Sequence, residues 1–176
     1  KGETIWELMW KSSRDVNAAD PVIVGDQIML SSSGGTAMLE PSGDGSPPVE
    51  VWRQHDLKWY FNPGVLVKEH VYSLHGTTHR PTELICTDTK TGESVWAEEG
   101  YGNGGLIVSA DEKVIMFDNG MLTIFRPSPE GFDPLIQQPL VEGKCWTAPV
   151  LADGQIYCRT AEGELVCVGL RPRDGS

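Results

Sequence analysis

The sequence predicts an all-β fold, a β-propeller of four-stranded antiparallel blades. Short β-type runs recur, each followed by a small turn and a second run, and from Asp26 the equivalent turns follow at steps of 43, 43 and 42 residues. An independent mark has nearly the same period, because Trp6, Trp52 and Trp96 are 46 and 44 residues apart. A period near 43 residues with four short strands per unit is typical of a propeller blade.

The composition agrees with this fold class and excludes several functions. The chain has 176 residues, and its 20 Gly and 12 Pro exceed average usage, which argues against long helices. The formal net charge is -11, whereas a nucleic-acid backbone is neutralised by clustered Lys and Arg, so we expect no nucleic-acid partner. Apolar runs are only three or four residues long, so we expect no membrane span.

Alternating apolar residues and turn residues place the strands of each blade, from the propeller axis outward. The chain is expected to open with an outer strand near residues 4–8. Three complete blades follow, with strands at 21–25, 27–32, 36–40 and 49–53, at 64–68, 70–75, 83–88 and 94–98, and at 105–110, 113–118, 121–126 and about 133–138. A last unit supplies strands at 148–152, 155–160 and 164–169 and lacks an outer strand. The opening strand would complete it and close the ring.

The blades occupy residues 1–170, and residues 171–176 form a tail. Sixteen strands make four blades, which is at the low end of the usual four to eight. We therefore expect the chain to be the C-terminal portion of a seven- or eight-bladed propeller. Two alternatives stay open: a self-closed ring of four blades, and a homodimer whose two copies form one ring of eight. No signal peptide is visible, but a leader on a longer precursor would not be seen here.

One segment carries a motif beyond the period. Residues 86–96 resemble the docking motif of the pyrroloquinoline-quinone (PQQ) type propeller repeat, Ala-x-Asp-x-x-Thr-Gly-x-x-x-Trp, with Cys86 in place of Ala. Residues 2–6 look like the tail of the same motif, and residues 48–52 like a degraded copy. The physical reason is local, since Asp and Thr-Gly make a tight turn and Trp lies over the neighbouring blade. The docking residues are therefore expected to be Trp6, Trp52, Asp88, Thr91, Gly92 and Trp96.

The resemblance implies two kinds of function. Some members of this family are quinoprotein dehydrogenases, which hold PQQ and calcium at the propeller axis. Others are cofactor-free, including the propeller lipoprotein of the bacterial outer-membrane barrel-assembly machinery and secreted relatives. A vicinal cysteine pair stacks on the quinone in many of the dehydrogenases, whereas none of the four cysteines here are adjacent. We therefore expect no cofactor in this chain, with PQQ and calcium as the alternative, and a periplasmic or extracellular location.

A binding surface is expected where the connections between blades gather. In a propeller, the loops from outer to innermost strand share one face with the loops that join the two middle strands. Asn17, Tyr60 and Asn103 recur every 43 residues in such loops. Aromatic and amide groups around a channel are typical of a recognition surface for a protein or peptide. The alternative is that these aromatics only fill the space between blades. The candidate set is Trp10, Arg14, Asn17, Trp59, Tyr60, Asn62, Tyr101, Asn103, Lys144 and Trp146.

No catalytic residue is predicted, because no nucleophile has a partnered base and no glycine loop precedes a helix. Cys158 and Cys167 are expected opposite each other on adjacent strands, as a disulfide or as two buried thiols. Cys145 is expected near solvent. His75 and His79 flank a loop that could hold a metal ion or could simply be solvated, and the absence of an obvious third ligand favours the second interpretation.

Overall fold

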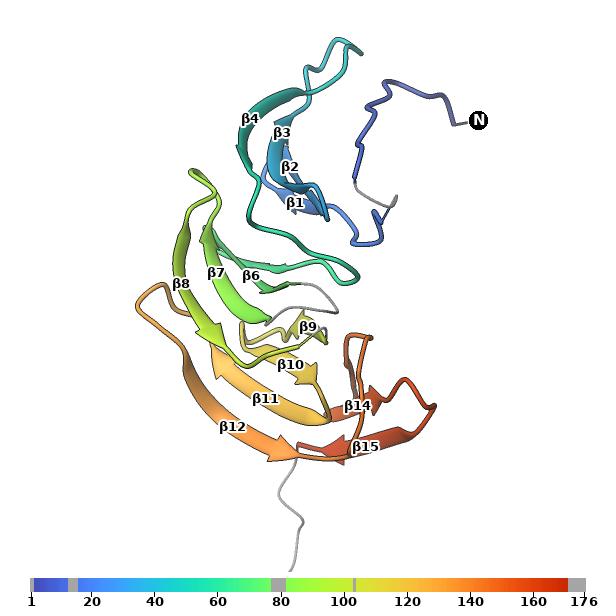
Figure 1. Ribbon diagram of the computed structural model, residues 1–176, viewed down its shortest axis with the longest axis vertical. Helices are drawn as coiled ribbons and strands as arrows, with labels where there is room; N and C mark the ends of the chain where they lie inside the picture. The colour runs from blue at the N-terminus through green and yellow to red at the C-terminus, as the bar shows by residue number, and fades with distance from the viewer. Residues whose placement is uncertain (1, 13–15, 77–81, 103, 171–176) are drawn as a thin grey trace, which may run out of the picture.

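The computed structural model describes residues 2–12, 16–76, 82–102 and 104–170, and within them the chain forms fifteen strands and no helix. Each sheet is an antiparallel meander, and the sheets follow one another along an arc (Figure 1). The first holds β1 (Val22–Val24), β2 (Gln27–Ser32), β3 (Gly35–Glu40) and β4 (Val49–Gln54); the second β5 (Val65–Val67), β6 (His70–His75), β7 (Glu83–Asp88) and β8 (Ser94–Glu99); the third β9 (Gly105–Val108), β10 (Val114–Asp118), β11 (Met121–Arg126) and β12 (Asp133–Pro139); the fourth β13 (Val150–Ala152), β14 (Gln155–Arg159) and β15 (Leu165–Gly169).

The predicted fold class is confirmed: the sheets are blades of a β-propeller. Three of the four turns that set the predicted period are two-residue hairpin turns with positive φ, at Gly25 (61°), Lys68 (56°) and Asp153 (49°), and such turns match the twist of the flanking strands. In each of these three turns, the innermost strand ends at the residue before the two turn residues, and the second strand begins at the residue after them. The turn of the third sheet is longer, because β9 ends at Val108 and β10 begins at Val114, with Glu112 at a φ of 58°.

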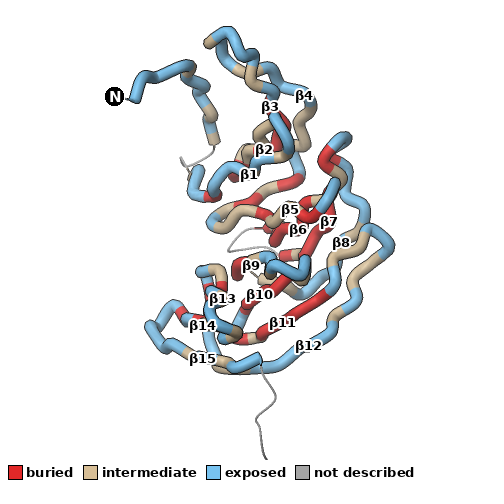
Figure 2. The backbone as a smooth tube through the Cα atoms, turned by 180° about the vertical axis from the view of Figure 1, so that it is seen from behind, coloured by how far each residue is buried: buried red, intermediate tan, exposed pale blue. Residues whose placement is uncertain are grey.

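The core lies between consecutive sheets rather than inside any one of them. The middle strands of the first three sheets are largely buried, whereas the outer strands β8 and β12 are mostly exposed and β4 is exposed along its first half (Figure 2). Met29 and Met38 of the first sheet pack with Val71 and Ile85 of the second. Equivalent apolar clusters join the second sheet to the third and the third to the fourth. Each sheet is therefore stabilised by its neighbours.

One predicted strand is wrong. Residues 2–12 form no strand, and the fourth sheet has three strands among the described residues, so the expected mixed blade is not formed. The reason is position, because the N-terminal segment lies beside the first sheet, at the opposite end of the arc from β15 (Figure 1). There Trp10 Nε1 donates to Ser32 Oγ at 2.9 Å. The edge of β15 therefore has no partner strand within the described part of the chain.

In the described part of the chain, no helix is long and apolar enough to cross a membrane.

Candidate functional site

The docking motif forms a tight turn between β7 and β8. Asp88 Oδ1 accepts hydrogen bonds from the backbone N–H groups of Lys90 (2.8 Å) and Thr91 (2.9 Å). Gly92 has a φ of 72°, and a Cβ atom on it would lie 2.6 Å from the indole ring of Trp52. Glycine is therefore required here by its backbone conformation and by the close approach of the indole from the preceding blade.

Tryptophans on the outer strands join neighbouring blades. Trp52 Nε1 donates to the backbone carbonyl of Thr89 at 2.9 Å, and Trp96 Nε1 donates to that of Ser128 at 2.8 Å. Both acceptors lie in the turn before the outer strand of the next sheet. Trp96 also packs beside Tyr72 and Phe132, with ring centroids 5.9 and 6.2 Å away. Trp6 lies half-buried in the N-terminal segment, which is not part of a sheet.

Three connections between blades meet at Asn62. They join β4 to β5 (residues 55–64), β8 to β9 (100–104) and β12 to β13 (140–149). Asn62 Nδ2 donates to the carbonyl of Gly104 at 3.0 Å and to that of Trp146 at 2.9 Å. One side-chain amide therefore holds loops from three successive blade junctions together. The three connections therefore meet at one place in the structure.

Exposed aromatic rings lie at this junction. Phe61 stacks on Trp146, with ring centroids 6.3 Å apart and an interplanar angle of 27°, and Tyr60 meets Phe61 edge-on at 6.0 Å. The Nζ atom of Lys144 lies 6.0 Å from the centroid of the Trp146 ring. Phe61 and Trp146 remain 39% and 46% exposed. We call Tyr60, Phe61, Lys144 and Trp146 the aromatic patch.

Sequence reasoning missed Phe61. Residue type and recurrence every 43 residues point to Tyr60, and Phe61 is the neighbour of that recurring position rather than one itself. The signal was the unbroken run of three aromatics and an amide at residues 59–62, from which only Phe61 was left out.

The other predicted site residues lie elsewhere. Trp59 is fully buried in the core between the first two sheets, so the packing interpretation describes it. Tyr101 is half-buried against Phe132 and accepts a hydrogen bond from Gln137 at 3.1 Å. Trp10 lies under the guanidinium of Arg53, and Asn17 donates to the carbonyl of Trp10, beside the first sheet. Arg14, Asn103 and His79 lie outside the described residues.

A buried carboxylate, that of Asp118, binds the connection between β8 and β9. Asp118, at the end of β10, is 3% exposed, and its two oxygens accept hydrogen bonds from the backbone N–H groups of Gly102 and of Gly104, the latter at 3.0 Å. Burial raises the pKa of this carboxyl above its usual value, and the two backbone hydrogen bonds partly oppose the shift. Asp118 thus holds the connection between β8 and β9 in place. Asn62 binds the carbonyl of Gly104 in the same connection.

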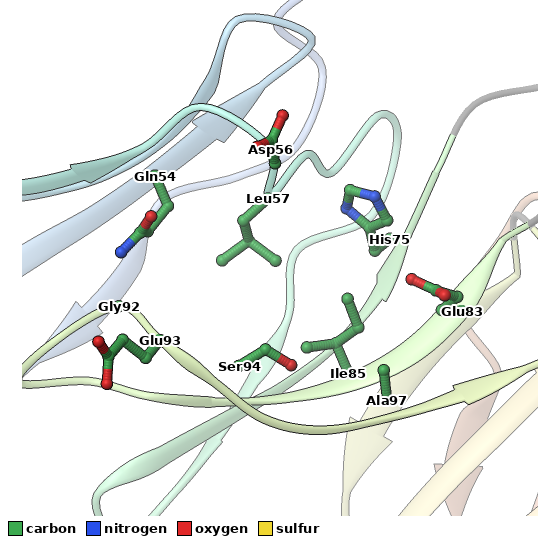
Figure 3. A pocket seen from close by; sticks show the side chains of 10 residues that line it. All are labelled: Gln54, Asp56, Leu57, His75, Glu83, Ile85, Gly92, Glu93, Ser94 and Ala97. Atoms are coloured by element: carbon green, nitrogen blue, oxygen red, sulfur yellow. The ribbon is translucent and has the colours of Figure 1, made fainter.

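The chain also has a groove of about 440 Å³ between the first and second sheets (Figure 3). Gln54 comes from β4, Asp56 and Leu57 come from the connection after it, and the remaining lining residues come from the second sheet and its last turn. His75 Nδ1 accepts a hydrogen bond from the backbone N–H of Lys58 at 3.0 Å. Burial lowers the pKa of His75, and so the imidazole is neutral at pH 7. The remaining lining residues are Glu83, Ile85, Gly92, Glu93, Ser94 and Ala97.

Two expectations about the cysteines are wrong. Cys158 pairs with Val166 and Cys167 with Tyr157, so the two thiols lie on opposite faces of the sheet and remain free. A register shift of one residue reverses the face to which a side chain points. Cys145 is buried rather than near solvent, and its sulfur accepts a hydrogen bond from the backbone N–H of Gly120 at 3.2 Å.

The expectation that this chain holds no PQQ and no calcium stays a prediction. The dehydrogenases that the repeat resembles use a vicinal cysteine pair, whereas here three free cysteines are buried at separate places and Cys167 is exposed on the fourth sheet. No group of three His, Cys, Asp or Glu side chains that could hold a metal ion occurs within the described ranges.

Comparison with known proteins supports the fold. No family model matches the chain, and no curated protein matches it. Among solved structures, the chain is similar to BamB from Moraxella catarrhalis, with a TM-score of 0.62 and 17% sequence identity over 85% of this chain and 44% of that one. A protein of unknown function from Bacteroides caccae (TM-score 0.48, 14% identity, 90% of this chain and 62% of that one) and Hsv2 from Kluyveromyces lactis (0.48, 10%, 85% and 43%) also match. The chain thus spans less than half of the length of BamB, and the likeness shows a propeller fold.

Proposed function

We propose that this chain is a non-enzymatic binding domain that recognises a protein or peptide through the aromatic patch. In this proposal it is a propeller of the PQQ-like repeat type that acts outside the cytoplasm, in the periplasm or the extracellular space. The repeat motif at residues 86–96 and the fold shared with BamB support this assignment. Its four blade units belong to a larger ring, completed by further blades or by a second copy.

The observation that carries the proposal is the stacking of Phe61 on Trp146, above backbone that the hydrogen bonds of Asn62 hold in place. Both rings are exposed, although aromatic rings of this size are normally buried. The Asn62 hydrogen bonds hold the backbone under both rings, so little conformational entropy is lost when a partner binds. Rigid aromatics of this kind are the commonest anchors of protein–protein interfaces.

The chemistry of the patch favours binding over catalysis. It offers two aromatic faces, a phenol and an ammonium group, and it contains no nucleophile with a hydrogen-bonded base. A partner with an apolar or aromatic side chain could extend the stack. The acidic chain disfavours nucleic acid as that partner, because the net charge of -11 repels phosphates.

The test is a binding measurement with a matched control. A partner captured from the extracytoplasmic extract of the source organism is purified and titrated against the chain by calorimetry. The double variant Phe61→Ala, Trp146→Ala should weaken binding at least tenfold. The control Val51→Ala, Val95→Ala removes exposed apolar side chains from outer strands and should leave the affinity unchanged. Equal affinities for the chain and the patch variant would overturn the proposal.

A further inference from the structure

The groove between the first and second sheets has an apolar floor and a charged rim. Leu57 and Ile85 are buried and reach it from the connection after β4 and from β7, and Ala97 adds a third apolar surface from β8 (Figure 3). Its volume of about 440 Å³ lies within the roughly 300–1,000 Å³ that is usual for sites of small ligands. The floor is therefore suited to an aliphatic segment rather than to a bare ion.

The charge of the rim is negative and is not neutralised by the groove itself. Asp56, Glu83 and Glu93 line it, and no Lys or Arg does so among the described residues. The four ion pairs found in the described part of the chain use other carboxylates, those of Glu50, Glu69, Asp111 and Glu112. The neutral imidazole of His75 adds no positive charge. Within the described ranges, no ion pair joins any of the three carboxylates to a cation, and the nearby charge of Lys58, which lowers the pKa of His75, does not line the groove.

The spacing of the three carboxylates does not suit a metal ion. Asp56 lies on the connection after β4, Glu83 at the start of β7 and Glu93 in the turn before β8. No three acidic or imidazole groups of the described residues are arranged to hold a metal ion. The rim therefore suits an extended ligand that carries several hydrogen-bond donors.

We propose that this groove binds an arginine side chain of a partner polypeptide. An arginine has an aliphatic stem that fits Leu57 and Ile85, and a planar guanidinium with five N–H donors that pairs with carboxylates. Gln54 and Ser94 can hydrogen-bond the backbone on either side of it. The site is separate from the aromatic patch, although Asp56 and Phe61 belong to the same connection. It does not depend on the proposed function.

The experiment uses a defined probe, acetyl-Gly-Arg-Gly-amide, followed by amide chemical shifts of the isotope-labelled chain. We expect saturable shifts at Leu57, Ile85 and Ala97. The same peptide with citrulline has the same shape without the charge and should bind at least fivefold more weakly. Equal binding of the two peptides would overturn the proposal, as would shifts that calcium alone produces at the same amides and that exclude the peptide.

Matched variants separate the groove from general charge attraction. Asp56→Asn, Glu83→Gln should weaken peptide binding at least fivefold, whereas Glu130→Gln, Glu142→Gln removes the same charge from exposed loops and should have no effect. Equal losses in both would show non-specific attraction and overturn the site. Ala97→Leu fills the floor without changing charge and should also block the peptide. The patch variant Phe61→Ala, Trp146→Ala should bind it normally, so the two proposals fail independently.

Discussion

The side-chain amide of Asn62 donates a hydrogen bond to the backbone carbonyl of Trp146 at 2.9 Å, across 84 residues of sequence. The same Nδ2 atom donates to Gly104 at 3.0 Å. A single polar side chain therefore joins three successive blade junctions. This joint holds the exposed rings of Phe61 and Trp146 against each other.

Replacing Asn62 by Ala should loosen the patch and lower stability. Two hydrogen bonds are lost, each worth about 0.5–1.5 kcal/mol net, so we expect the free energy of unfolding to fall by about 1–3 kcal/mol. Denaturant melts followed by tryptophan fluorescence measure the change. Asn17→Ala is the matched control, since within the described residues the Asn17 side chain donates one exposed hydrogen bond, to Trp10, and the change should cost less than half as much. Equal costs would contradict a special role for Asn62.

Much of the fold was predictable because local signals agree with it. The strands β6, β7 and β11 have the predicted bounds, since alternating side chains and tight turns define both ends. The predictions that were wrong depend on contacts between residues far apart in the sequence, which no local pattern indicates. Residues 4–8 resemble an outer strand, but they lie beside the first sheet and away from β15. Of the candidate site, the burial of Trp59 and the exposure of Phe61, two positions apart, could not be told from residue type.

The register error at Cys158 shows how small such a difference can be. The turn between β14 and β15 is closed by Thr160 N–H donating to the carbonyl of Glu164 at 3.0 Å, which centres it on Glu162. The sequence prediction, which sets Cys158 opposite Cys167, places the centre of this turn half a residue later, between Glu162 and Gly163. The partner of Cys158 is therefore Val166 instead of Cys167.

Trp96→Ala should destabilise the chain through lost packing and a lost hydrogen bond. Trp96 contacts Tyr72 and Phe132 and donates to Ser128, but it is only half-buried. We expect a cost near the lower end of the roughly 3–5 kcal/mol typical of large buried aromatics. Urea melts compare it with Trp146→Ala, whose exposed ring should contribute much less. A cost below about 1 kcal/mol for Trp96→Ala would contradict its role in joining the second and third blades.

Asp118 should make the free energy of unfolding depend on pH, with a sign opposite to the one usual for a carboxylate. Its pKa is raised in the folded chain by burial, so the folded state holds this proton more tightly than the unfolded state. Its contribution is therefore fully present below the unfolded value near 3.8 and is lost as pH rises through the folded pKa. Asp118→Asn removes this loss, and its free energy of unfolding relative to the wild-type chain should rise between pH 4 and 7. A constant difference across that range would contradict the assignment.

Thiol labelling should distinguish one cysteine from the other three. Cys167 is exposed on β15, whereas Cys86, Cys145 and Cys158 are buried. Burial also raises the pKa of Cys86 and of Cys158 to about 11, which leaves little thiolate at pH 7.5. Under native conditions an alkylating reagent should therefore modify one thiol rapidly, and in denaturant all four. Intact mass spectrometry counts the adducts, and Cys167→Ser should remove the rapid phase. Two rapid adducts in the wild-type chain would show that a second thiol reaches solvent, and a rapid phase that survives Cys167→Ser would place the exposed thiol elsewhere.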